Sequence, residues 1–149
     1  EIVYKDCNNF KKKKDIQRLK SNFNKRAISE SAPNIGSKFT SYTVNKGSRI
    51  IMCIRNKDKL AKLHDINMLM FVAIHEIGHI MTLENGHPPI FWDNMKYLLR
   101  YAIKHGLYTP SNYVSTPKLY CGMKINNSPL PFIDADACNK NVDNCNEGS

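Results

Sequence analysis

The sequence predicts an α+β fold in which an N-terminal helix is followed by a small sheet and then by two further helices. Three observations support this prediction. Two short apolar segments flank a tight turn in the first half of the chain, and two longer segments with helical spacing follow them. The chain has 149 residues, 42% hydrophobic and 23% charged, which favours a folded domain and excludes a disordered or fibrous protein.

The first predicted element is an amphipathic helix within residues 8–30, because apolar residues recur there at helical spacing. Pro33 and Gly36 lie in the polar stretch that follows and should end it. We therefore expect residues 1–38 to form a basic N-terminal helical segment. The net charge of the chain is +9, and nine basic residues lie among the first thirty. This excess predicts DNA or another acidic partner for the N-terminal region.

A β-hairpin is expected next. Phe39 to Val44 and Arg49 to Arg55 read as two strands, and the polar residues 45–48, with Gly47, read as the turn between them. Cys53 lies within the second strand, where we expect it to be a small buried hydrophobe. The chain has five cysteines, an odd number, and bridges are an open alternative for the four that lie near its ends: Cys7, Cys121, Cys138 and Cys145.

Two helices follow the predicted hairpin. Asp65 is a plausible N-cap for a helix over residues 66–83, and the apolar run Met68 to Ile74 predicts that this helix is buried on all sides. That run is far shorter than the roughly 20 residues that span a bilayer. Pro88 and Pro89 suit the first turn of a second helix, over residues 89–105.

The rest of the chain lacks a sustained period. Residues 107–132 read as an irregular segment that wraps around the domain, and residues 133–149 read as a polar tail. The predicted organisation is therefore a basic segment over residues 1–38, a domain over residues 39–132 and the C-terminal tail.

The motif that predicts chemistry is H-E-x-x-H, formed by residues 75–79 inside the first of these two helices. His75 and His79 lie four residues apart on one face of a helix, so both imidazoles can reach one metal ion. Zinc is the expected ion, because it favours imidazole ligands and retains an open position for water. Glu76 lies on the neighbouring flank, where it can act as the general base.

A third ligand is needed, and His87 is the leading candidate because the turn at Asn85-Gly86 can fold the chain back over the helix. Glu84 and Asp93 remain alternatives. His64 and His105 lie outside the cluster, and Tyr113 and Tyr120 are weaker candidates for oxyanion stabilisation.

An H-E-x-x-H zinc site with a general base is typical of metalloproteases. Substrate binding is expected at a sheet edge, because proteases with such a zinc-binding helix commonly hold the substrate as an added strand. The strand from Arg49 to Arg55 directly precedes the motif helix, so it is our candidate for that edge. The residues expected to bind the substrate are Ile51, Cys53 and Arg55.

The chain resembles the zinc metallopeptidases predicted in large eukaryotic DNA viruses, which in turn resemble WLM and SprT-like proteases. The likeness covers roughly residues 39–131, and the residues that carry it are Ser41 to Arg55, Leu69 to His79, Gly86-His87, Phe91-Trp92 and Tyr120 to Met123. The resemblance implies a minimal zincin-like fold, with His75, His79 and His87 as zinc ligands and Glu76 as general base. It also implies substrates among DNA-associated proteins, and a membrane anchor upstream of residue 1 in some viral members.

The sequence therefore predicts a zinc-dependent endopeptidase that acts on a protein or peptide substrate, located in the host cell or virion of a large DNA virus. The alternative is a virion structural or minor capsid-type protein on a zincin fold, with little or no activity and with neighbouring virion proteins as partners. A third hypothesis, plain nucleic-acid binding, rests on charge alone.

Overall fold

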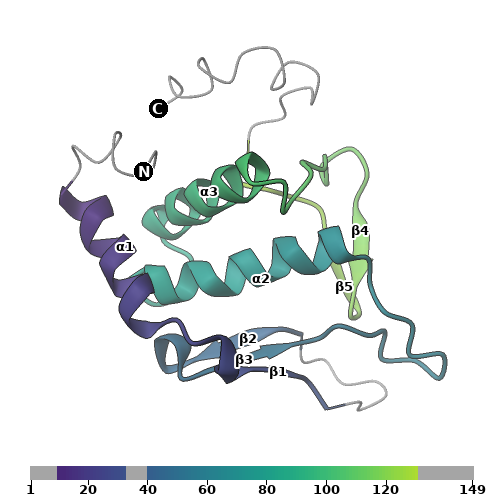
Figure 1. Ribbon diagram of the computed structural model, residues 1–149. Helices are drawn as coiled ribbons and strands as arrows, with labels where there is room; N and C mark the ends of the chain where they lie inside the picture. The colour runs from purple at the N-terminus through teal and green to yellow at the C-terminus, as the bar shows by residue number, and fades with distance from the viewer. Residues whose placement is uncertain (1–9, 33–39, 131–149) are drawn as a thin grey trace.

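Helix α2 (Ile66–Met81) lies at the centre of the domain, with α3 (Pro89–Lys104) on one side and a small sheet on the other (Figure 1). The computed structural model describes residues 10–32 and 40–130. Its helices and small sheets confirm the α+β class predicted from the sequence. The other elements are α1 (Phe10–Asn22), η2 (Lys25–Ala27), β1 (Ile28–Glu30), β2 (Tyr42–Val44), η3 (Asn45–Gly47), β3 (Arg49–Met52), β4 (Lys118–Tyr120) and β5 (Met123–Ile125).

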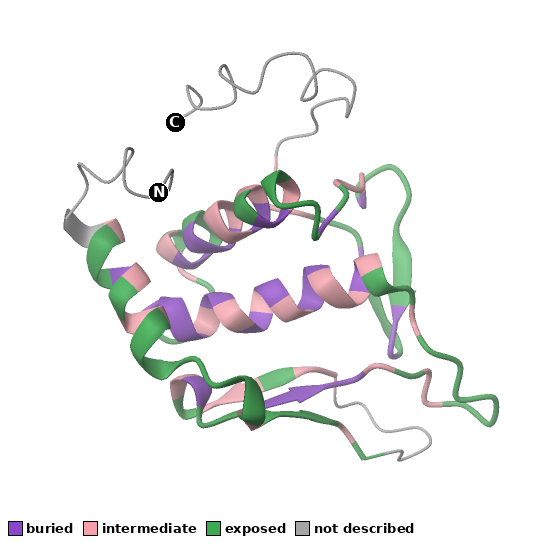
Figure 2. Ribbon diagram, viewed as in Figure 1, coloured by how far each residue is buried: buried purple, intermediate pink, exposed green. Residues whose placement is uncertain are grey.

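The two central helices match the sequence prediction closely. The carboxylate of Asp65 accepts a hydrogen bond from the Met68 N–H at 2.9 Å, which is the expected N-cap. Helix α2 ends two residues earlier than expected, because Thr82 adopts an extended conformation. Buried and partly buried residues run along nearly all of α2 (Figure 2), as its apolar sequence predicted. No helix among the described residues has the length and hydropathy needed to cross a membrane.

The sheet has the strand order β1-β3-β2, so β3 is its central strand. Strand β2 pairs with β3 in antiparallel fashion, which confirms the predicted hairpin with shorter strands. Strand β1 pairs with β3 in parallel and was not predicted. Its residues lie within the predicted N-terminal helix, which ends instead at Asn22. Pairing with β3 overrides the local helical pattern, because that partner strand is available only in the folded chain.

The N-terminal helix is attached to the rest of the domain by buried polar contacts. The carboxylate of Asp15, 4% exposed, accepts hydrogen bonds from Arg18 at 2.6 Å and from Asn94 at 3.1 Å. The Asn94 amide also donates to the Thr82 hydroxyl at 3.0 Å, and Lys12 donates to the Asn94 carbonyl oxygen at 2.6 Å. This network joins α1 to the end of α2 and the start of α3. The helical part of the predicted N-terminal segment thus contacts the rest of the fold.

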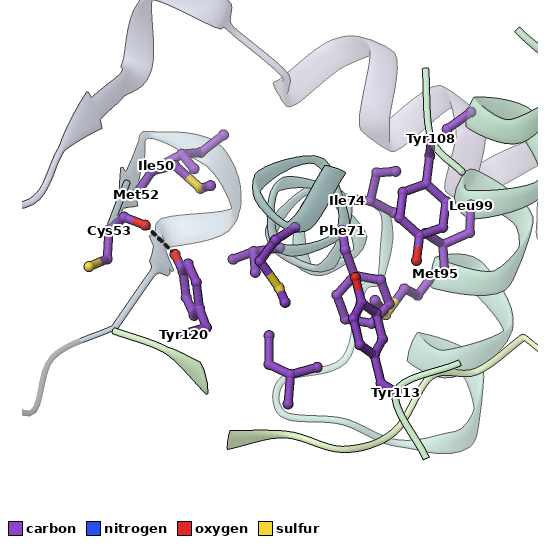
Figure 3. Close-up of a cluster of buried hydrophobic side chains, with 14 of the residues drawn as sticks. Ile50, Met52, Cys53, Phe71, Ile74, Met95, Leu99, Tyr108, Tyr113 and Tyr120 are labelled. Carbon is purple, nitrogen blue, oxygen red and sulfur yellow. Dashed lines mark hydrogen bonds between the residues drawn. The ribbon is translucent and has the colours of Figure 1, made fainter. Parts of the chain in front are cut away.

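The C-terminal wrapping segment is more regular than predicted. Strands β4 and β5 form a hairpin whose two-residue loop, Cys121-Gly122, has positive φ at both positions. Three tyrosines of the segment fill the core beside α2 and α3 (Figure 3): Tyr108, Tyr113 and Tyr120. The predicted tail, residues 133–149, lies outside the described residues.

A disulfide bond joins Cys53, just after β3, to Cys121 in the β4–β5 loop. The sequence predicted Cys53 as a small buried hydrophobe; its side chain is buried, but it is also bonded. The Tyr120 hydroxyl donates to the Cys53 carbonyl at 2.6 Å (Figure 3), so a hydrogen bond supports the same junction. Together these contacts hold the β4–β5 hairpin against the end of β3.

Gly47→Ala is expected to lower the free energy of unfolding by at least about 2 kcal/mol, as measured by urea denaturation. Gly47 has a φ of +113°, and an added Cβ would lie 2.8 Å from the backbone oxygen of Asn22 and 3.2 Å from the Ile80 side chain. Gly106→Ala is the matched control, because Gly106 has a φ of +69° with open space around it. A loss no larger than that of the control would contradict the predicted clash.

Candidate metal centre

Three histidines come together at the end of α2. His75 and His79 lie one turn apart on the helix, and His87 reaches them from the loop that leads to α3. One nitrogen from each ring lies within 4.8 Å of the other two, and the Nε2 atoms of His75 and His87 are 3.0 Å apart. The sequence-predicted ligands are thus adjacent in space, although they span two elements.

The position of His87 depends on the turn after α2, which is bound by a lysine from the connection between β2 and β3. Lys46, in η3, donates hydrogen bonds to the carbonyl oxygens of Thr82 at 2.8 Å and Glu84 at 2.7 Å. These contacts satisfy carbonyl groups at and beyond the end of α2, where the helix offers no partner. Gly86 then adopts a positive φ, which directs His87 back over the helix.

Neither alternative to His87 belongs to the cluster. Glu84 is exposed, and its backbone carbonyl rather than its carboxylate is bound by Lys46. The Asp93 carboxylate forms an ion pair with Lys12 at 2.6 Å. Within the described residues, only the three histidines form a group with metal-binding spacing.

The three imidazoles fit a zinc ion by geometry and by charge. Tetrahedral Zn–N bonds of about 2.05 Å place two ligand nitrogens about 3.3 Å apart, close to the observed separation of His75 and His87. Burial, reinforced by the neighbouring histidines, lowers the pKa of His75 to about 3. Burial also lowers the pKa of His79 to about 4, with smaller contributions from His87 and Lys46. Both rings are therefore neutral at pH 7, as metal ligands must be.

Aromatic residues at the start of α3 hold these rings in place. Phe91 is fully buried, and its ring centre lies 4.9 Å from that of His75, 4.5 Å from that of His79 and 4.7 Å from that of His87. Trp92 stacks on His87 with ring centres 5.4 Å apart. In the Phe-Trp pair noted in the sequence, Trp92 thus packs against the exposed His87, and Phe91 packs against all three histidines.

Gly78→Ala is expected to weaken zinc binding and to destabilise the protein by about 1–3 kcal/mol. In a helix interior this change would otherwise stabilise by about 1 kcal/mol. Here the added Cβ would lie 3.1 Å from the Phe91 ring, which cannot move aside because the three histidines surround it. Zinc titration and thermal unfolding of both proteins would measure the effects. A more stable variant with unchanged zinc affinity would show that Phe91 does not constrain the ligands.

Glu76 lines the same cleft and is 4% exposed. The Thr43 hydroxyl of β2 contacts the Glu76 carboxylate at 2.8 Å and the Glu76 backbone carbonyl at 3.1 Å. Burial raises the pKa of Glu76 to about 7, and the hydrogen bond from Thr43 opposes part of that rise. Sequence reasoning missed Thr43, because its role requires β2 to lie against α2.

The cleft around these residues has a volume of about 1180 Å³. Its walls are β2 with the residues just before it, the face of α2 that carries His75 and His79, the His87 loop, the start of α3, Tyr120 and residues 123–129. Tyr120 lines this cleft, but its hydroxyl already donates to the Cys53 carbonyl. Tyr113 is buried and packs against Phe71 with ring centres 4.9 Å apart. Both tyrosines, the weaker candidates for oxyanion stabilisation, therefore have packing roles in the hydrophobic core.

The prediction that β3 offers the free edge of the sheet is wrong. Strand β3 pairs with β1 on one side and β2 on the other, so its backbone has no unpaired edge. Ile51 and Cys53 are buried, Arg55 pairs with Glu30 at 2.8 Å, and none of the three predicted substrate-binding residues lines the cleft. The edge strand that lines the cleft is β2. Recognising β1 in the sequence would have shown that β3 is central.

The other two histidines lie outside the cluster. His64 Nε2 accepts a hydrogen bond from the Cys121 N–H at 3.3 Å, and burial lowers the pKa of His64. The His105 ring lies 4.3 Å from that of Tyr101 at the end of α3. Both side chains have local structural contacts.

The known proteins that this chain resembles in sequence are viral proteins. No family model matches the chain, and no solved structure matches it significantly. It is 33% identical to the uncharacterized protein R325 of Acanthamoeba polyphaga mimivirus over 115 residues, which are 77% of this chain and 57% of that protein. It is 42% identical to protein 136R of Invertebrate iridescent virus 6 over 69 residues, 46% of this chain and 38% of that protein. Protein 042R of Invertebrate iridescent virus 3 is 37% identical over 83 residues, 56% of this chain and 50% of that protein.

The chain thus spans about half the length of the curated relatives it matches. All three come from large DNA viruses, which supports the expectation of a viral protein. Their names state no activity and therefore carry no evidence on catalysis.

Proposed function

We propose that this chain is a zinc-dependent endopeptidase of the H-E-x-x-H type. The observation that carries the proposal is the convergence of three histidine nitrogens beside the carboxylate of Glu76 in one open cleft. Such a donor set leaves a coordination position free, as catalytic rather than structural zinc sites do. When bound, zinc would supply Lewis-acid chemistry that polarises a carbonyl and makes water a nucleophile near neutral pH.

The protein's own groups would perform the remaining steps. Glu76 accepts a proton from the attacking water and donates it to the amine that leaves when the C–N bond breaks. The Thr43 hydroxyl holds this carboxylate in place, and burial keeps bulk water from solvating it. The roles of His75, His79 and His87 are to hold the ion and keep it facing the cleft.

The substrate would be an extended polypeptide lying along β2. The side of β2 away from β3 pairs with no other described strand, and β2 lines the cleft beside the three histidines. An added strand would satisfy the free backbone groups of this edge and bring a peptide bond close to the cluster. The resemblance of the sequence to WLM and SprT-like proteases is consistent with the proposed endopeptidase, and it suggests DNA-associated proteins as substrates. The proposal itself rests on the histidine cluster and Glu76.

The test is a cleavage assay with metal-free protein, before and after one equivalent of zinc is added. An unfolded substrate such as reduced, alkylated protein should be cut only in the presence of zinc, and a chelator should stop the reaction. Zinc binding without cleavage of any substrate would overturn the peptidase and favour the virion structural alternative instead. Absence of zinc binding would overturn the peptidase as well, whereas the structural alternative would be overturned by absence of the protein from purified virions.

A further inference from the structure

Two lysines line the candidate cleft without a carboxylate partner. Lys96 lies in the second turn of α3 and Lys124 lies on β5, on different walls of the cleft. Within residues 10–32 and 40–130, neither side chain belongs to an ion pair. Their charges therefore remain available to a ligand.

The acids of the cleft do not balance these charges. The described residues that line it include two carboxylates, Glu76 and Asp93. Glu76 is buried and bonded to Thr43, and Asp93 is paired with Lys12 at 2.6 Å. A third cation, Lys46, also lines the cleft, and its ammonium group binds backbone carbonyls. A divalent ion held by three neutral imidazoles would add further positive charge.

We propose that Lys96 and Lys124 are specificity-determining residues, which select polypeptide segments that carry an acidic side chain close to the bond to be cut. The inference rests on the proposed function for the cleavage step, but the binding preference follows from the charges of the cleft. An acidic side chain placed between the walls would pair with one or both ammonium groups, whereas a basic segment would be repelled.

A polypeptide suits this cleft better than a nucleic acid does. The edge of β2 that pairs with no other described strand offers hydrogen-bonding groups at strand spacing, which match a peptide backbone. Nucleic-acid binding would call for a row of unpaired cations that follows the phosphates. Lys12 and Arg18 of α1 are instead engaged by Asp93 and Asp15.

The experiment measures peptide binding in the absence of turnover. Full-length Glu76→Gln protein loaded with zinc would be titrated with a fluorescent peptide that carries two central glutamates, and with the matched peptide that carries glutamines. We expect the acidic peptide to bind about tenfold more tightly at low salt, with the difference shrinking as salt is added. Lys96→Gln and Lys124→Gln should each reduce this preference about three- to fivefold, and the double variant should abolish it.

Lys104→Gln is the matched control, because Lys104 lies on α3, is exposed and does not line the cleft. Equal binding of both peptides, or an equal loss with Lys104→Gln, would overturn the proposal. Displacement of the acidic peptide by a single-stranded oligonucleotide at comparable affinity would overturn it as well.

A charge-reversal variant adds a gain-of-function readout. Lys96→Glu should lose the acidic peptide and bind a matched peptide with two central lysines more tightly than the parent does. Failure of the proposed function would show separately, as absence of cleavage by zinc-loaded wild-type protein. The peptide preference could persist in that case.

Discussion

Replacing Glu76 with glutamine is expected to lower kcat by about 10²- to 10⁴-fold while leaving zinc content unchanged. Glutamine has nearly the shape of glutamate and can still accept the hydrogen bond that Thr43 donates, so the local packing should persist. It cannot accept a proton from water. The fall should therefore appear in kcat rather than in KM. Cleavage kinetics and metal analysis on the same preparation would check both parts.

Glu84→Gln is the matched control for this change. Glu84 lies just beyond α2 and is exposed, and Lys46 holds its backbone carbonyl rather than its side chain. Its activity should stay within about twofold of the parent, since its carboxylate does not line the cleft. A Glu76→Gln protein that keeps its zinc and cleaves as fast as the parent would rule out Glu76 as the base.

Removal of a ligand should have a comparably large effect on metal binding. His87→Ala is expected to lower zinc affinity at least about a hundredfold, because two imidazoles alone hold zinc weakly. His87 is exposed, so this variant should fold, whereas His75 and His79 lie deeper. For the parent, zinc at one hundred times its dissociation constant should raise the free energy of unfolding by about 2.7 kcal/mol, and His87→Ala should lose that gain.

Calorimetric titration and thermal unfolding with and without a chelator would measure these effects. His105→Ala is the control, since His105 is an exposed histidine that contacts Tyr101 away from the cluster. Unchanged zinc affinity in His87→Ala would assign the third position to another residue. Double variants with Glu84→Ala and Asp93→Ala would then identify it.

Features encoded by nearby residues could be predicted from the sequence. The buried character of α2 follows from its continuous apolar run, and its start follows from Asp65. The spacing of His75 and His79 fixes both rings on one face, and the turn at Gly86 brings His87 back to them. The hairpin of β2 and β3 could also be predicted from nearby residues, because both strands adjoin a short turn.

Features that depend on distant partners could not be predicted. Residues 28–30 become a strand only because β3 lies beside them, and without β1 the sheet order could not be deduced. That omission led directly to the wrong choice of edge strand. The Cys53–Cys121 bond joins residues separated by 68 positions, and five cysteines allow many pairings.

The contact between Thr43 and Glu76 has a mechanical consequence. Thr43 belongs to the edge strand β2, and its hydroxyl donates a hydrogen bond to the buried Glu76 carboxylate of α2. Under the proposed function, a polypeptide that pairs with β2 would therefore act on the Glu76 carboxylate through this hydrogen bond. Substrate binding and alignment of the proposed base would then be coupled, and we expect a peptide too short to pair with β2 to be cleaved more slowly.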